Sequence, residues 1–403
     1  MTPDLATIVF IATYAALALG HIPGLRVDRA GAALIGASLM VAANVLTLAQ
    51  AYAAINLDTI VLLLGMMIVV ANLRISGFFA LVSEWVVEHA HHPLTMLGAI
   101  AVVSGALSAF FVNDTVCLVL APLVLEVTVA MKRNPVPYLL AVAMASNAGS
   151  LATLTGNPQN MLIGSFSGIP YRAFARSLAP VAVVSVAVAV AVIALLYRRE
   201  FRSAERVEVE KRGVPLDRAL LWKSLAISAL MMIAFFVGAP VAKAAIVGGA
   251  ILLLISRSVH PEEVYNLIDW PLLVMFAGLF IVVAGVEKSA LQRGLDAAAA
   301  HAHLNNGAVL TAITAALSNI VSNVPAVLVF KPFVAHLADP RLGWLRLAMA
   351  STLSGNLTIL GSVANLIVVE QARSRVRIGF WEYAAAGIPV TIATLAIGVW
   401  MLG

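Results

Sequence analysis

Four short polar segments interrupt long apolar stretches of this chain, and they hold residue types that bind ions and small solutes. We name them tip one (residues 108–115) and break one (153–160) in the first half, and tip two (318–325) and break two (354–365) in the second half. Asn, Ser and Thr oxygens can coordinate a cation, while Gly and Pro unwind a helix and free its carbonyls. A helix that restarts after a break presents N–H groups to an anion. The segments therefore predict a site for an ion and a small solute.

We expect the binding residues to be the polar and helix-breaking members of these segments. They are Asn113, Asp114, Thr115, Thr155, Gly156, Asn157, Asn160, Ser322, Asn323, Gly361, Ser362 and Asn365. The strongest single signal is Gly156-Asn157-Pro158, because glycine and proline together are rare in the middle of a span. Helix packing through small residues and asparagine hydrogen bonds is the alternative, but two matched pairs of breaks favour binding.

Asp114 is the most informative charged residue. It lies deep in the apolar stretch 94–131, where an ionised carboxylate is costly and marks a functional position. It could bind Na⁺, or take up and release a proton, so we predict that it is the coupling residue and that Asn113 to Thr115 form a Na⁺ site. Capping of a half-helix by Asp114 is the alternative. The second half has Val324 at the corresponding place.

The elements that position these segments are predicted to be membrane-spanning helices. Of the 403 residues, 62% are hydrophobic and 11% are charged, whereas about a quarter of the residues in a soluble domain are charged. Several uncharged runs have the roughly 20-residue length that crosses a bilayer. The composition excludes a soluble enzyme, a disordered chain and a disulfide scaffold. The ten expected spans are residues 5–21, 31–49, 58–73, 138–166, 178–197, 219–237, 240–256, 270–286, 345–370 and 384–402.

Two further apolar stretches, 94–131 and 307–338, each carry a tip in the middle, and we expect them to be re-entrant hairpins. The second half also repeats the first at an offset of about 205–211 residues. Matching pieces are Ala106-Leu107-Ser108 with Ala316-Leu317-Ser318, Met144-Ala145-Ser146 with Met349-Ala350-Ser351, and Pro180 with Pro389. Each copy would hold five spans and one hairpin, and because five is odd the second copy would be inverted in the membrane.

The predicted fold is thus an all-α polytopic membrane protein made of two inverted-topology repeats, each with one broken helix. The repeats would be residues 1–200, with a broken helix at 138–166, and residues 219–403, with a broken helix at 345–370. A basic linker at 201–218 joins them, and its Lys and Arg residues favour the cytoplasmic side. This orientation places 17 of the 25 Lys and Arg residues on the cytoplasmic face and both termini outside. The formal charge of +5 then reflects orientation in a bacterial-type inner membrane, not nucleic-acid binding.

These segments resemble the ion transporter superfamily, which includes arsenite efflux pumps, NhaD-type sodium/proton antiporters and sodium-coupled symporters of divalent anions. In the dicarboxylate symporters a Ser-Asn-Thr motif marks each hairpin tip and each unwound segment. Here tip one has Asn113-Asp114-Thr115, and tip two has Ser322-Asn323-Val324 and departs at its third position. The Asn-Asp pair at the first tip is similar to that of the arsenite pumps. The resemblance covers nearly the whole chain, is closest to arsenical pump membrane proteins and related anion permeases, and implies an elevator-type mechanism.

We therefore predict a secondary active transporter of small anions or oxyanions that uses a proton or sodium gradient, with arsenite or antimonite efflux as the leading specific function. The alternatives are a sodium/proton antiporter and a sodium-coupled dicarboxylate or sulfate symporter. An intramembrane enzyme is not expected, because the sequence lacks both a His-Glu-x-x-His motif and paired membrane aspartates. We expect no cofactor beyond the coupling ion. The expected partners are a small anion, membrane lipid, a second copy in a homodimer and, for an arsenical pump, a cytoplasmic ATPase.

Overall fold

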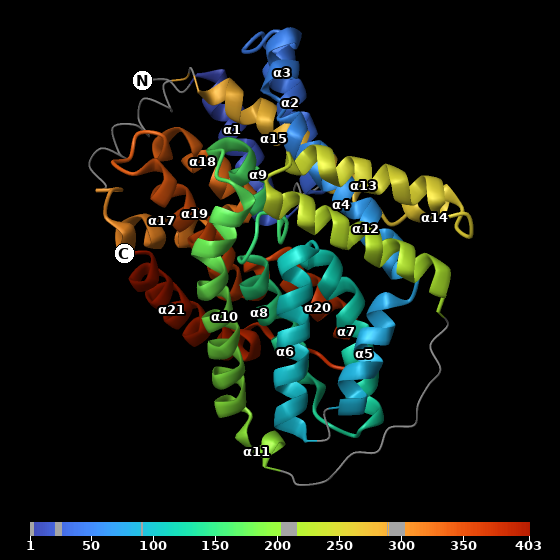
Figure 1. Cartoon of the computed structure of the whole chain (residues 1–403). Helices are drawn as coiled ribbons and strands as arrows, with labels where there is room; N and C mark the ends of the chain where they lie inside the picture. The colour runs from blue at the N-terminus through green and yellow to red at the C-terminus, as the bar shows by residue number, and fades with distance from the viewer. Residues whose placement is uncertain (1–3, 21–25, 90–91, 203–215, 288, 290–302) are drawn as a thin grey trace.

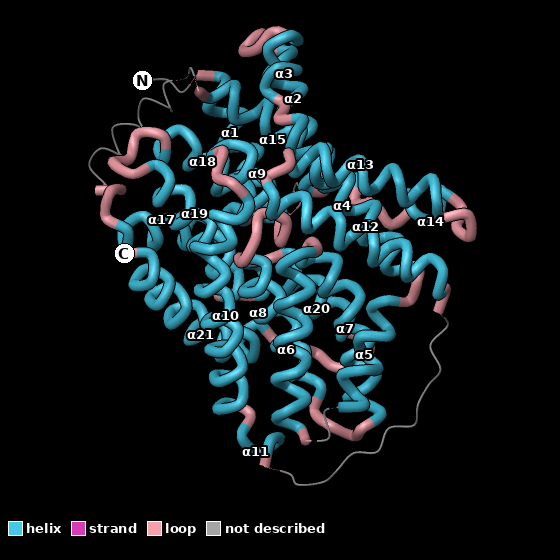
Figure 2. Tube along the Cα trace, viewed as in Figure 1, coloured by secondary structure: helices cyan, strands magenta, loops and turns pink. Residues whose placement is uncertain are grey.

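The computed structural model describes residues 4–20, 26–89, 92–202, 216–287, 289 and 303–403, and within these ranges helices are the only extended regular elements (Figure 2). The helices before residue 203 are α1 (Leu5–Leu19), α2 (Arg29–Ala42), α3 (Leu48–Ala54), α4 (Leu57–Ile75), α5 (Phe78–His89), α6 (Pro93–Phe110), α7 (Asn113–Ala130), α8 (Pro135–Ser150), α9 (Pro158–Ser167), α10 (Tyr171–Leu196) and α11 (Arg198–Phe201). Those after residue 215 are α12 (Arg218–Val237), α13 (Val241–Ile255), α14 (Pro261–Tyr265), α15 (Trp270–Val286), α17 (Gly307–Val321), α18 (Asn323–Val334), α19 (Pro340–Leu353), the 3₁₀ turns η1 (Ser354–Asn356) and η2 (Ile359–Gly361), α20 (Val363–Ala372) and α21 (Phe380–Leu402).

Each predicted span coincides with at least one helix. In the described part of the chain, six helices are long and apolar enough to cross a membrane: α4, α6, α7, α10, α12 and α21. The arms of the first predicted hairpin, α6 and α7, are 18 residues long, which is also the length of a full crossing. The arms of the second, α17 and α18, are 15 and 12 residues long. Re-entry of the hairpins stays a prediction, as does the cytoplasmic side of the linker, whose residues 203–215 lie outside the described part.

The helices pack into two groups (Figure 1). We name the first group the frame, and in it α2 packs on α15, α4 on α13, α12 on α13 and α1 on α2. We name the second group the core bundle, in which α6, α7 and α10 surround α8, while α17, α18 and α21 pack on α19 and α20 packs on α7. The two hairpins and both broken helices belong to the core bundle, so all four polar segments lie within one packed group of helices.

Glycine brings the backbones of the frame helices together at two matched crossings. A Cβ atom on Gly65 of α4 would lie 2.5 Å from the carbonyl carbon of Ala245 in α13. A Cβ atom on Gly278 of α15 would lie 2.7 Å from the carbonyl carbon of Ala33 in α2. Small residues at such crossings let two helices approach at backbone distance within a bilayer. Each crossing joins a helix of the first half to one of the second, so the frame holds the two halves together.

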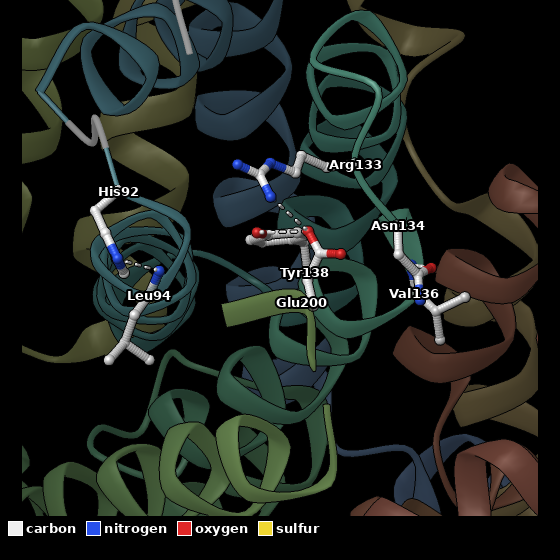
Figure 3. Close-up of polar contacts among 7 residues, drawn as sticks. All are labelled: His92, Leu94, Arg133, Asn134, Val136, Tyr138 and Glu200. Atoms are coloured by element: carbon white, nitrogen blue, oxygen red, sulfur yellow. Dashed lines mark hydrogen bonds and ion pairs between the residues drawn. The ribbon is translucent and has the colours of Figure 1, made fainter. Parts of the chain in front are cut away.

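A polar cluster fixes the end of the core bundle from which the linker leaves (Figure 3). The Tyr138 hydroxyl donates to Glu200 Oε1 at 3.4 Å, and Arg133 Nη1 lies 4.0 Å from the same oxygen. The Phe201 ring meets the Tyr138 ring edge-on, with centroids 5.9 Å apart. These contacts tie α11 to the start of α8, so the first turn of α8 and the end of α10 are held against each other.

Gly65→Ala should destabilise the frame, because the added Cβ has no room against the Ala245 backbone. Overpacking of this kind costs about 1–3 kcal/mol, to be measured as the unfolding free energy in detergent. Gly98→Ala in α6 is the matched control, since a Cβ at Gly98 meets nothing within 4 Å and alanine favours helix by up to about 1 kcal/mol. Equal losses in both variants would contradict the close crossing.

Candidate functional site

Both predicted breaks are present as gaps between two helices. α8 ends at Ser150 and α9 begins at Pro158, where the Asn157 side chain caps the new helix by accepting from the Asn160 N–H at 2.8 Å. In the second half, α19 gives way to η1 and η2, and the Ser362 hydroxyl caps α20 by accepting from the Ala364 N–H at 3.2 Å. The two caps occupy matching positions in the two halves, so each broken helix restarts in the same way.

One buried asparagine in each half satisfies the carbonyls that its break sets free. Asn160 Nδ2 donates to the Ser150 carbonyl at 3.1 Å and to the Thr153 carbonyl at 2.9 Å. In the second half, Asn365 Nδ2 donates to the carbonyls of Gly355 at 2.7 Å and Thr358 at 2.9 Å. Unpaired carbonyls within a membrane are costly, so these two amides let the chain leave helical geometry there.

Tip one is bonded directly to break one. The Asn113 N–H donates to the Gly156 carbonyl at 3.0 Å, and the Thr153 hydroxyl donates to the Ala109 carbonyl. Ser108 Oγ lies 2.7 Å from Ser146 Oγ on α8. Gly156 leaves no space for a side chain, because a Cβ there would overlap the Ser150 carbonyl.

Tip two meets break two in a matching way. Ser322, between α17 and α18, has φ +80°, a conformation that few non-glycine residues adopt. With its amide oriented to suit its neighbours, Asn323 Nδ2 donates to the Gly361 carbonyl at 3.2 Å and the Ser351 carbonyl at 3.1 Å. Asn319 Nδ2 donates to the Ser354 carbonyl at 2.9 Å. Both tips therefore dock through an asparagine on the glycine carbonyl that ends the neighbouring break.

Side chains from the two halves also meet each other, and the residues that join them are absent from the predicted set. Asn147 of α8 bonds to the side chains of Asn356, Ser362 and Asn365 in break two. Thr352 Oγ1, at the counterpart position in α19, accepts from Asn157 Nδ2 at 3.3 Å and Gln159 Nε2 at 3.2 Å. One feature of the sequence pointed to these two residues. The matching pieces Met144-Ala145-Ser146 and Met349-Ala350-Ser351 immediately precede Asn147 and Thr352.

The structure separates the twelve predicted site residues: eight lie in one buried cluster, two line a cavity, Thr155 bonds to another group of side chains, and Ser322 is the half-buried residue between α17 and α18. Asn113, Gly156, Asn157, Asn160, Asn323, Gly361, Ser362 and Asn365 lie in the buried cluster where the tips meet the breaks. Asp114 and Thr115 instead line a cavity of about 80 Å³, together with Arg74 and Asp269 of the frame, and the Asp114 carboxylate also lies within hydrogen-bonding reach of the Ala364 N–H in break two. Thr155 lies on the far side of break one, where its hydroxyl is 2.9 Å from the Tyr171 hydroxyl. The structure therefore does not place Asp114 beside Asn113 as one ligand set.

The buried cluster offers oxygen atoms suited to a cation. Among the described residues, three amide oxygens of the tips and breaks are buried and have no hydrogen-bond partner: Asn113 Oδ1, Asn160 Oδ1 and Asn319 Oδ1. Buried polar atoms are nearly always paired, and neutral amide oxygens are hard ligands for alkali and alkaline-earth cations. In the described ranges, no group of His, Cys, Asp and Glu side chains is arranged to hold a transition metal.

A larger cavity, of about 550 Å³, lies between the frame and the core bundle. Asn56 and Asp58 of the frame line it, together with Phe166 and Lys331 of the core bundle. Lys331 Nζ is 3.5 Å from Oε1 of Glu287, the residue that follows α15, and 4.8 Å from the centre of the Phe166 ring. This volume falls within the roughly 300–1,000 Å³ of small-molecule sites.

The charges of the two cavities are reversed between the halves. In the larger cavity, the core bundle supplies the basic residue and the end of α15 supplies the acidic one, Lys331 and Glu287. In the smaller cavity, the core bundle supplies Asp114 and the end of α4 supplies Arg74. Asp58 and Asp269, which hold matching places at the starts of α4 and α15, complete the two linings. Each cavity is thus lined by the start of one frame helix, the end of another and residues of the core bundle.

Comparison with known proteins gives a family and a fold. The model of the family described as "Citrate transporter" matches residues 8–354. The "46 kDa membrane protein" of Mycobacterium leprae is 32% identical, over 98% of this chain and 96% of that protein. The "Silicon efflux transporter LSI3" of Oryza sativa subsp. japonica is 30% identical, over 95% of this chain and 94% of that protein. The "Putative transporter arsB" of Dictyostelium discoideum is 24% identical, over 98% and 90%.

Among solved structures, the YdaH transporter of Alcanivorax borkumensis matches with a TM-score of 0.61 at 15% identity, over 99% of this chain and 97% of that one. MtrF of Neisseria gonorrhoeae, described as one of a class of antimetabolite efflux pumps, matches with a TM-score of 0.61 at 15% identity, over 99% and 93%. The predictions of a multi-pass membrane transporter, of the superfamily resemblance and of a protein that is not an enzyme are confirmed.

Asn160→Asp should destabilise the core bundle, because an ionised carboxylate cannot donate to the Ser150 and Thr153 carbonyls. Leaving buried acceptors unpaired costs about 1–3 kcal/mol each, to be measured as the free energy of unfolding in detergent. Asn306→Asp is the matched control, since Asn306 only accepts from N–H groups at the start of α17 and aspartate caps as well. If both variants lose the same free energy, the role given to Asn160 is wrong.

Proposed function

Because this chain belongs to the citrate transporter family, we propose that it is a secondary active transporter of small anions or oxyanions that uses a proton or sodium gradient. The observation that carries the proposal is the buried cluster where two hairpin tips meet two broken helices. Its side chains are neutral amides and hydroxyls, and three amide oxygens in its described residues, those of Asn113, Asn160 and Asn319, are unpaired. Such a cluster can take up an ion and a solute together and release both at low cost.

The alternating movement would be that of the core bundle against the frame. Under the predicted inverted repeat, the two cavities open to opposite sides of the membrane, and the larger one faces outward. An elevator-type displacement of the core bundle would open the 80 Å³ cavity to the cytoplasm and close the other. The matched glycine crossings support this proposal, because they keep the frame rigid while the core bundle moves.

We assign the coupling of solute transport to the ion gradient to residues in the first half of the chain. Na⁺ would bind at tip one through Asn113 Oδ1, whose lack of a partner in the described structure fits a cation ligand. Asp114 would serve as the proton- or cation-coupling group in the smaller cavity, where its only nearby basic residue in the lining is Arg74. Val324 at the counterpart position gives the second half no such group.

Arsenite and antimonite are the leading solutes for efflux, since the Asn113-Asp114 pair matches the arsenite pumps. Citrate, dicarboxylates, sulfate and silicic acid are the other solutes to compare. The second candidate function is sodium/proton exchange without an anion, which the carboxyl group of Asp114 favours. Homodimer assembly and, for arsenite efflux, a cytoplasmic ATPase partner remain part of the proposal.

Proteoliposomes holding the purified chain would decide among these solutes under an imposed proton or sodium gradient. The proposal expects gradient-driven flux of at least one of arsenite, antimonite, citrate, succinate, sulfate or silicic acid. Sodium-driven proton flux with no added anion, and no anion flux, would favour the exchanger instead. Flux of none of these species under either gradient would overturn transport coupled to H⁺ or Na⁺.

Asp114→Asn should lower the rate of gradient-driven transport at least about tenfold, because the amide can neither carry a proton nor offer a charge. The variant should still fold and insert into the membrane. Asp28→Asn is the matched control. Asp28 is exposed and only caps α2, accepting from the Gly31 N–H at 2.8 Å, a role that asparagine keeps. Wild-type coupling in Asp114→Asn would remove the coupling role from this residue.

The inverted repeat predicts opposite accessibility of the two cavities. Cys117 is buried, so Lys331→Cys and Arg74→Cys can each be labelled as a single accessible cysteine. An impermeant thiol reagent should label Lys331→Cys from outside intact cells and Arg74→Cys only in inside-out vesicles. Labelling of both from the same side would contradict the inverted arrangement.

A further inference from the structure

We propose that Asn147 is a positioning residue that couples ion binding at tip one to the conformation of break two. Through it, the two halves would bind the ion and the solute cooperatively. This inference rests on the proposed function. Asn147 lies in α8, four residues before Leu151, and is 1% exposed. It is absent from the four polar segments and from the predicted binding set.

Both ends of the Asn147 amide are fully used. Its Oδ1 accepts from Asn113 Nδ2 at 3.1 Å and from the Ser362 hydroxyl at 3.0 Å. Its Nδ2 donates to Asn356 Oδ1 at 2.9 Å and to Asn365 Oδ1 at 2.9 Å. An amide has two donor hydrogens and an oxygen that accepts twice, so no bonding capacity is left over.

The partners of Asn147 show what it connects. Asn113 is the tip-one residue whose Oδ1 is unpaired, so a cation bound there would polarise the same amide that donates to Asn147. The other partners belong to break two: Ser362 caps α20, and Asn365 holds the carbonyls of the break. If ion binding shifts the Asn113 amide, the Asn147 side chain therefore transmits that shift to break two. It reaches both the Ser362 cap of α20 and the Asn365 amide that bonds the freed carbonyls.

The matching connection, from tip two to break one, is not formed in the described residues. Thr352, the counterpart of Asn147, makes two longer contacts to Asn157 and Gln159 and none that is described to tip two or to Asn160. As a result Asn160 Oδ1 is unpaired, whereas the matching Asn365 Oδ1 accepts from Asn147. The repeat would make the two halves equivalent, and the exchange of Asn for Thr at this place makes break two depend on tip one.

Hydrogen exchange of residues 354–366 tests the connection without any assumption about the solute. Asn113→Ala should speed their exchange at least about fivefold in the wild-type chain, because break two loses the support passed through Asn147. In an Asn147→Ala background the same change should add less than about twofold, as expected when the connecting residue is gone. An equal effect of Asn113→Ala in both backgrounds would overturn the proposal.

Transport kinetics distinguish a positioning role of Asn147 from a role in protein stability alone. Asn147→Ala should raise the concentration of the driving cation, H⁺ or Na⁺, needed for half-maximal flux by at least about tenfold. Asn72→Ala is the matched control, because Asn72 is an equally buried asparagine in frame helix α4, where its amide bonds the Ile68 carbonyl and the Ser256 hydroxyl. It should shift that concentration by less than about twofold. An unchanged cation dependence in Asn147→Ala would contradict the positioning role even if its stability fell.

A milder variant keeps the test decisive if Asn147→Ala does not insert. Asn147→Ser retains a hydroxyl that can replace part of the bonding, and it should give intermediate exchange rates and cation dependence. Wild-type values for both quantities would count against the proposal. If no coupled flux is found for any solute, the proposed function fails, while the hydrogen-exchange comparison still decides whether tip one and break two are connected.

Discussion

The need to satisfy backbone carbonyls where a helix is interrupted inside a membrane is the constraint on which the rest of this structure depends. Each break frees carbonyls that no water in the bilayer can bond. Asn160 and Asn365 meet the need with two donors each, from the first turn of the restarted helix. Because each asparagine belongs to the helix that follows its break, the restart of that helix and the pairing of the carbonyls are one event.

A cluster of neutral polar groups, the proposed binding site, follows from this solution. The breaks leave carbonyls, amides and hydroxyls close together, and the tips dock on the glycines at their ends through Asn113 and Asn323. Charged residues stay at the two cavities between the frame and the core bundle. The cluster can therefore bind without a fixed charge that would hold its ion permanently, while the charged cavities bias which ions approach.

The positions of the breaks and spans could be predicted from the sequence, because polar and helix-breaking residues inside apolar runs are costly in a bilayer unless the helix is interrupted there. The division of the site could not. Asn113 and Asp114 are adjacent in sequence, but neighbouring residues at the start of a helix point about 100° apart, so one faces α8 and the other faces the frame. Asn147 was missed because the repeated Met-Ala-Ser before it marks the position without showing its role, and its partners in break two are about 210 residues away. The unusual backbone of Ser322 likewise depends on tertiary packing.

The central claim is that ion and solute bind where the two tips meet the two breaks. A cryo-electron microscopy map of the chain in nanodiscs, with its transported anion and driving cation added, tests it most directly. The account predicts density beside Asn113 and between the two tips, in contact with both breaks. Density confined to the 550 Å³ cavity, with the tips and breaks unoccupied, would contradict it.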